Sequence, residues 1–220
     1  MSKIWKYGIV SIGMVLFSVE LEAHQLNIKV ESKSNKPLAN IVVFVEPEDK
    51  SLVEKHHSAK QLKASVDQLN RQFVPHISVV QRSTNVDFPN SDNIKHHVYS
   101  FSPAKSFEIK LYDDQKASPI LFDKTGEVTL GCNIHDWMLG YVYVVDTPWF
   151  GKTDEQGKLS LDLPTGKYKL KIWHPLLQGS DANYAQRVDI PANSTHVVSL
   201  KDEMSPAHSA YEEDDELDGY

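Results

Sequence analysis

The chain has 220 residues, of which 24% are charged and 40% are hydrophobic, and its formal net charge is −7. All of that charge lies in the last twenty residues, where eight acidic side chains accompany one lysine, so the preceding residues are formally neutral. A neutral body excludes the basic footprint of a nucleic-acid-binding protein, and we expect no nucleic-acid partner. Residues 202–220 have little to bury and are predicted to form a disordered acidic tail.

The N-terminus has the pattern of a secretory signal peptide. Lys3 and Lys6 precede an apolar run to about Val19, and the small residue Ala23 stands at the junction. The run is shorter than the roughly 18–20 residues that a membrane-spanning helix needs. We therefore predict that residues 1–23 are a signal peptide cleaved after Ala23, that the protein is exported to the periplasm, and that it does not insert into the membrane afterwards. An uncleaved anchor is the alternative.

Strand patterns dominate the next part of the chain. Apolar residues alternate with polar ones over residues 26–30, and a continuous apolar run over 41–45 indicates a buried strand. The lysine-rich stretch that follows is interpreted as a linker or short helix, over 51–63 or as far as about Leu69.

Alternation returns after this stretch. One strand face is expected to hold Phe73, Pro75, Ile77 and Val79, and the next to hold Val86 and Phe88. Further strands are predicted at 96–101, 107–112, 128–132, 140–145, 159–163, 168–172, 188–190 and 197–200. Short strands at this spacing predict an all-β sandwich.

The run from Cys132 to Met138 offers metal donors in the order C-x-x-H-x-x-M. Thiolate and thioether are soft donors, and imidazole binds both oxidation states of copper. An exported protein with a single cysteine has no disulfide partner for it within the chain, which a metal ligand would explain. A blue-copper site also needs a second histidine. Zinc is less suited, because structural zinc sites use Cys and His without Met.

The second histidine has candidates in His96-His97-Val98, which follow Phe88-Pro89-Asn90 after a short loop. Here the chain resembles the cupredoxins, amicyanins and pseudoazurins most closely, over about residues 64–146. The whole chain is also similar to exported cupredoxin-like proteins labelled "methylamine utilization protein".

The resemblance implies a cupredoxin Greek-key β-sandwich. It also implies one type 1 copper per chain, bound by His96, Cys132, His135 and Met138. The family's ligand precedes a polar residue and then Val, which selects His96. His97, which stands where the family has Asn, remains the alternative ligand.

The implied function is electron transfer. The protein would be a periplasmic, non-enzymatic carrier that cycles between Cu(II) and Cu(I) with a redox partner such as a dehydrogenase, cytochrome or oxidase. The alternative is a copper-binding adaptor, sensor or copper carrier. His24, as a new N-terminal residue, and the pair His56-His57 are candidates for a second metal site.

The segments that flank the copper region resemble carboxypeptidase-regulatory (transthyretin-like) domains. The resemblance rests on Thr153-Asp154-x-x-Gly157-x-Leu159 and Leu163-Pro164-x-Gly166-x-Tyr168. It implies a discontinuous β-sandwich from residues 24–50 and 147–201, with the cupredoxin segment 64–146 inserted. In the simpler alternative, residues 24–50 add strands to the cupredoxin sheet.

Overall fold

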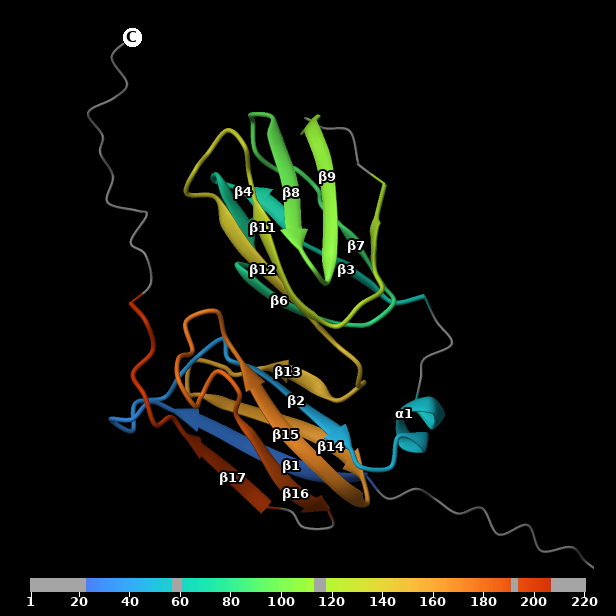
Figure 1. The fold of residues 1–220 in the computed structure, drawn as a ribbon, viewed down its shortest axis with the longest axis vertical. Helices are drawn as coiled ribbons and strands as arrows, with labels where there is room; N and C mark the ends of the chain where they lie inside the picture. Colours follow the sequence, from blue (N-terminus) through green and yellow to red (C-terminus); the bar gives the residue numbers. More distant parts are fainter. Residues whose placement is uncertain (1–22, 57–60, 113–117, 191–193, 207–220) are drawn as a thin grey trace, which may run out of the picture.

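The computed structural model describes residues 23–56, 61–112, 118–190 and 194–206, and this part of the chain is almost entirely β-strand (Figure 1). The all-β prediction is therefore confirmed. The predicted signal peptide lies outside the described residues except for Ala23, and so does the predicted tail from residue 207 onward. The prediction that disorder begins at residue 202 is wrong, because the N–H of Ser205 donates to the carbonyl oxygen of Leu176 and Met204 packs against the lower core. No helix among the described residues is long and apolar enough to cross a membrane.

Strands from the two ends of the described chain form the lower body in Figure 1. One sheet has the order β14–β1–β17, with bounds Lys158–Pro164, Ala23–Glu31 and Ser194–Ser199. The other has the order β13–β2–β15–β16, with bounds Phe150–Lys152, Val42–Pro47, Gly166–Trp173 and Ala185–Ile190. Both sheets contribute to one hydrophobic cluster, which includes the alternating residues Leu26, Ile28 and Val30 of β1. The period-two pattern in the sequence therefore marks the inward face of this sandwich.

The middle of the chain forms the upper body. Its large sheet has the order β6–β12–β11–β8–β9, with bounds Ile77–Gln81, Leu139–Val145, Gly126–Gly131, His96–Ser102 and Lys105–Tyr112. The second sheet has the order β10–β7–β3, with bounds Ile120–Phe122, Thr84–Asp87 and Lys63–Ser65. A separate hairpin of β4 (Asp67–Leu69) and β5 (Gln72–Val74) completes the upper body. These strands enclose a separate hydrophobic cluster that contains Cys132 and Met138.

A third, smaller cluster joins the two bodies. Val42 and Phe44 of β2 pack with Ile77 of β6 and Val145 of β12. Beside them the ring of Tyr143 on β12 stacks on Trp173 of β15, with centroids 4.6 Å apart. Strand β12 therefore contacts the lower sandwich as well as the core of the upper one.

The prediction of a helix as far as Leu69 is wrong. The helix α1 ends after five residues (Ser51–Lys55), and residues 63–69 contain β3 and β4 instead. Strand β3 pairs in parallel with β7, and Val66, directly after it, is fully buried in the upper core. These tertiary contacts override a local sequence that is polar and rich in lysine.

The prediction that Phe73, Pro75, Ile77 and Val79 share one face is also wrong. Phe73 packs in the upper core, whereas Ile77 and Val79 belong to the cluster between the two bodies. Pro75 is exposed in the link between β5 and β6, so the two strands are separate and their alternation starts anew.

The burial of His174, which follows β15, is expected to make stability depend on pH. Burial, and then the charge of His76, lowers the pKa of His174 from 6.5 to about 4, and its Nδ1 accepts the N–H of Leu176 at 3.2 Å. Because the unfolded chain takes up this proton near pH 6.5, protons favour the unfolded state between these two values. We expect this group to lower the free energy of unfolding by about 1–2 kcal/mol between pH 7 and pH 4, allowing for solvent screening. Urea unfolding of the copper-free protein should show a weaker pH dependence for His174→Gln, and an unchanged dependence would contradict the prediction.

Candidate metal centre

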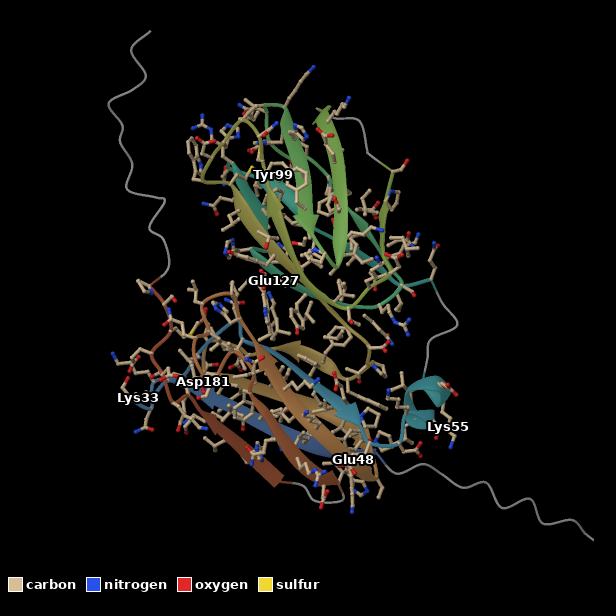
Figure 2. The ribbon with its side chains drawn as sticks, in the orientation of Figure 1. Lys33, Glu48, Lys55, Tyr99, Glu127 and Asp181 are labelled. Carbon is tan, nitrogen blue, oxygen red and sulfur yellow. The ribbon has the colours of Figure 1, made fainter. Side chains whose placement is uncertain are left out.

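The single cysteine follows a strand and begins a tight loop. Strand β11 ends at Gly131, and Cys132, 4% exposed, comes directly after it. The N–H of Met138 donates to the carbonyl oxygen of His135 at 2.9 Å, just before the chain enters β12. Gly131 pairs with Tyr99 of β8, labelled in Figure 2, and a Cβ at position 131 would lie 2.7 Å from the tyrosine ring. Glycine therefore allows β8 to lie close to the strand that carries the thiol.

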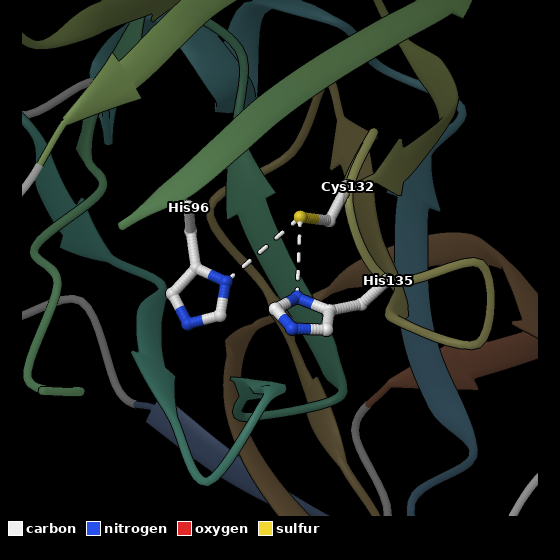
Figure 3. Close-up of side chains that lie close together, drawn as sticks. All are labelled: His96, Cys132 and His135. Carbon is white, nitrogen blue, oxygen red and sulfur yellow. Dashed lines mark hydrogen bonds between the residues drawn. The ribbon is translucent and has the colours of Figure 1, made fainter. Parts of the chain in front are cut away.

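Three predicted ligands come together beside this loop (Figure 3). The Nδ1 atom of His96 and the Nδ1 atom of His135 each lie 3.8 Å from Sγ of Cys132. One donor atom from each residue lies within 4.8 Å of the other two, and this is the one such cluster of three or more metal-ligating side chains in the described chain. The two imidazole ring centroids are 5.0 Å apart.

The two histidines differ in their surroundings. His96 begins β8 and is completely buried. His135 lies in the loop, is partly exposed, and has its ring centroid 5.4 Å from that of Trp137, which is 42% exposed. Burial lowers the pKa of His135, and the charges of His96 and Arg71 lower it further. A lowered pKa favours the neutral imidazole, which is the form that binds a metal.

Met138, the fourth predicted ligand, is 1% exposed and belongs to the same hydrophobic cluster as Cys132. Its thioether is therefore on the protein side of the loop, among apolar side chains. A soft, neutral donor suits such surroundings better than a carboxylate does, because burying a charge without a partner is costly.

His97, the rival of His96, lies away from the thiol. Its Nε2 is 3.0 Å from Oε1 of Glu108 on β9, and its ring is in edge contact with Tyr99. The pairing of β8 with β9 is irregular between His96 and Val98, but the contacts separate the two histidines, because His96 lies against Cys132 whereas His97 lies against Tyr99 and Glu108. The geometry thus brings His96 to the thiol and leaves His97 on the other face of the sheet.

Asp92 is a residue of the centre that the sequence did not reveal. Its Oδ2 lies 2.7 Å from Nε2 of His96, and its carboxylate accepts the backbone N–H groups of Asn70 and Arg71 at 2.7 and 2.8 Å. Burial raises the pKa of Asp92, but the bonds from Arg71, His96 and Asn70 outweigh it and hold the pKa below its usual value. The one sequence signal for Asp92 was its spacing of four residues from His96. That spacing is informative only when the loop between them is known to fold back and bring the two side chains together.

Each imidazole nitrogen lies at a distance from the sulfur that one bound ion can span. Metal–nitrogen and metal–sulfur bonds of about 2.0 and 2.3 Å, as in zinc sites, would place N and S about 3.8 Å apart at an angle of about 120°. Thiolate, two imidazoles and a buried thioether form the donor set that copper takes in blue-copper sites. The residues at this centre therefore fit copper better than zinc.

The other candidate histidines are not brought into a cluster. His24 lies on β1 opposite Leu163, and His56 packs its ring against Trp149 while its Nδ1 lies 2.8 Å from the carbonyl oxygen of Leu52. His57 lies outside the described residues. Neither His24 nor His56 belongs to a cluster of three or more metal-ligating side chains among the described residues, and a second site that uses a new N-terminus or His57 stays a prediction.

Comparisons with known proteins give partial likenesses. No protein-family model matches the chain, and no curated protein matches it in sequence. A copper-containing nitrite reductase from Thermus scotoductus SA-01 is similar over 40% of this chain and 23% of that one, with 22% identity and a TM-score of 0.37. An oxidized amicyanin mutant is similar over 46% and 99%, with 15% identity and a TM-score of 0.35. A pseudoazurin from Methylobacterium extorquens AM1 is similar over 39% and 76%, with 23% identity and a TM-score of 0.33. At such identities and TM-scores these likenesses assign neither a family nor an activity to the chain.

Proposed function

We propose that this protein is a periplasmic electron carrier that holds one type 1 copper ion between His96, Cys132, His135 and Met138. The observation that supports it most is the meeting of two imidazole nitrogens and one thiol sulfur within 4.8 Å. Bound there, copper would supply a single-electron couple between Cu(II) and Cu(I). Since the thioether would complete the donor set, we expect no open position for a substrate and hence no enzymatic activity.

The elements that carry the donors support a carrier. His96 begins β8, Cys132 follows β11 and Met138 precedes β12, and these three strands are neighbours in one sheet. The pairing of these strands holds the ends of the segments that carry the donors, which supports a site formed before any ion binds. A site that is already in place needs little rearrangement when its charge changes, which favours rapid electron transfer.

Addition of Cu(II) to the purified copper-free protein tests the proposal. We expect one equivalent to produce an intense blue absorption band and an EPR spectrum with narrow copper hyperfine splitting, and both should disappear and return on reduction and reoxidation. A colourless protein with an ordinary tetragonal Cu(II) signal would reject the type 1 site. Rapid loss of Cu(I) to a mild chelator would instead favour the alternative of copper delivery.

Electrons are proposed to pass at the His135 side of the site. His135 is the partly exposed histidine, and Trp137 and Ile134 beside it are 42% and 48% exposed. Apolar and aromatic side chains of this kind are enriched at protein interfaces. This surface is where we expect the redox partner to dock, whether a dehydrogenase, a cytochrome or an oxidase.

Trp137→Ala is expected to slow electron transfer to the redox partner about tenfold or more, because an aromatic anchor at the centre of an interface commonly contributes 1–2 kcal/mol or more to binding. The blue band should not change, since Trp137 supplies no ligand. Stopped-flow mixing of the reduced protein with candidate partners measures the rate. Phe101→Ala, which removes an 81% exposed aromatic side chain from β8, is the control. Equal slowing by both variants would argue against electron transfer through the surface around His135.

The domain division is also a proposal. Residues 24–50 and 147–201 would form a transthyretin-like sandwich, and residues 64–146 would form an inserted copper domain. The two separate hydrophobic clusters support it, because each body buries its own apolar side chains. A variant that weakens only the lower sandwich tests the division and is described in the Discussion.

A further inference from the structure

The hairpin β4–β5 carries an unusual turn that faces the candidate metal centre. Its two turn residues, Asn70 and Arg71, have φ angles of 54° and 58°. Two-residue hairpin turns of type I′ require positive values at both positions, and glycine is preferred at the second. Arginine stands there instead, so its backbone conformation needs support from neighbouring groups.

The carboxylate of Asp92 gives that support. Its Oδ1 accepts the N–H of Asn70 at 2.7 Å, and its Oδ2 accepts the N–H of Arg71 at 2.8 Å. Backbone donors held by a two-residue turn have little freedom to move. The carboxylate is thereby fixed in position, and its side chain is only 9% exposed.

The same carboxylate holds His96. Nε2 of His96 lies 2.7 Å from Oδ2 of Asp92, while Nδ1 of the same ring lies 3.8 Å from Sγ of Cys132. A carboxylate can only accept a hydrogen bond, so the proton of a neutral His96 belongs on Nε2. The lone pair of Nδ1 is then directed toward the thiol, where an ion would bind.

The hairpin also contacts the chain at two further places near the centre. Asp67 of β4 accepts the hydroxyl of Ser91 at 2.7 Å, which ties the loop before His96 to the hairpin. On the opposite side the ring of Phe73 on β5 lies against Gly140 of β12, where a Cβ would come within 2.8 Å of the phenylalanine. One hairpin therefore touches both segments that carry the candidate ligands.

We propose that Asp92, anchored by the β4–β5 turn, is the positioning residue that sets the tautomer of His96 and lowers the reduction potential of the bound copper. This inference rests on the proposed function and deepens it. A carboxylate behind a ligating imidazole makes the imidazole a stronger donor, and its negative charge in a buried site favours the more positive oxidation state. Asp92 thus links the geometry of the hairpin to the redox properties of the centre.

The first test uses the copper-free protein. Long-range ¹H–¹⁵N correlation spectra of histidine-labelled protein distinguish the two neutral tautomers. We expect His96 to carry its proton on Nε2, in a hydrogen bond that slows its exchange with water. In Asp92→Ser this preference should be lost or strongly reduced, because the shorter hydroxyl does not reach Nε2 of His96. Asp92→Asn can keep the tautomer, because its amide oxygen also accepts a hydrogen bond. Retention of the same tautomer and the same slow exchange in Asp92→Ser would overturn the proposal.

The second test uses the copper-loaded protein. At a fixed applied potential, Asp92→Asn should raise the ratio of Cu(I) to Cu(II) about tenfold, which corresponds to an upward shift of about 59 mV for one electron. Copper affinity should fall about 10- to 100-fold, as is usual when the partner of a ligating histidine is removed. An unchanged potential in Asp92→Asn would overturn the proposal.

Asp67→Asn is the matched control. Asp67 ties the same loop to the same hairpin but has no hydrogen bond to His96 among those the structure gives. It should weaken the fold without moving the His96 tautomer or the potential, and equal shifts in both variants would reduce Asp92 to a structural role. If the tautomer depends on Asp92 but wild-type protein gives no blue copper, the proposed function fails while the role of Asp92 in orienting His96 stands.

Discussion

Replacing Cys132 by serine is expected to abolish the blue colour of the copper-loaded protein. The intense band of a type 1 site arises from the copper–thiolate bond, and a serine hydroxyl is a harder donor that stays protonated at neutral pH. Copper affinity should fall by more than the 10- to 100-fold typical of losing a residue behind the ligands, since a ligand itself is removed. Optical titration with Cu(II) and competition with a chelator measure both effects. A blue Cys132→Ser protein would contradict the assignment of the thiol.

The histidine pair of β8 offers a matched control for this experiment. His96→Ala should behave like Cys132→Ser, because Nδ1 of His96 lies 3.8 Å from the sulfur. His97→Ala should stay blue, since its ring lies beside Tyr99 and Glu108 on the other face of the sheet. The reverse result would make His97 the ligand.

Gly157→Ala is expected to lower the free energy of unfolding by about 2–4 kcal/mol. Gly157 has a φ of +72°, and a Cβ there would lie 2.4 Å from the carbonyl oxygen of Val30, a backbone atom near the C-terminal end of β1. Val30 is held by its pairing with Val198 of β17, and its carbonyl oxygen accepts the N–H of Leu38 at 3.0 Å, so this backbone cannot move away without losing hydrogen bonds. Urea or thermal unfolding measures the loss.

Gly126→Ala separates the two causes of that loss, which are the positive φ and the clash of the new Cβ with a backbone atom. Gly126 also has a positive φ, +123°, but a Cβ there meets only the side chain of Ala104 at an ordinary 3.5 Å. Gly126→Ala should therefore lower the free energy of unfolding by less than Gly157→Ala does. Folded Gly157→Ala should still bind copper with a normal spectrum, because Gly157 belongs to the lower sandwich. Disturbed copper spectra would contradict the proposed division into two domains.

Much of the strand content followed from alternation of apolar residues. The patterns over residues 26–30 and 41–45 predicted β1 and β2 because each strand buries apolar side chains in the lower core. Residues 63–69 were missed because β3 has just three residues and is held by its pairing with β7. The local sequence of β3 gives no sign of a partner strand about twenty residues away.

The candidate ligands were predictable to a similar degree. Cys132, His135 and Met138 are close in sequence, and the loop brings the first two together. Choosing between His96 and His97 required knowing on which face of β8 each side chain lies. The sequence left this open because apolar residues follow on both faces. Asp92 could not be found at all, because its role depends on the turn at Asn70 and Arg71, more than twenty residues earlier in the chain.

The position of β1 determines the order in which this chain can fold. The first strand of the described chain lies between β14 and β17, which are more than 120 residues further along. Its backbone groups have no sheet partner until β14, and then β17, have been synthesised. The strands of the upper body, in contrast, all lie within residues 63–145 and can pair earlier. Closing so long a loop is slow, so the β1 edge stays exposed to misfolding for the longest time.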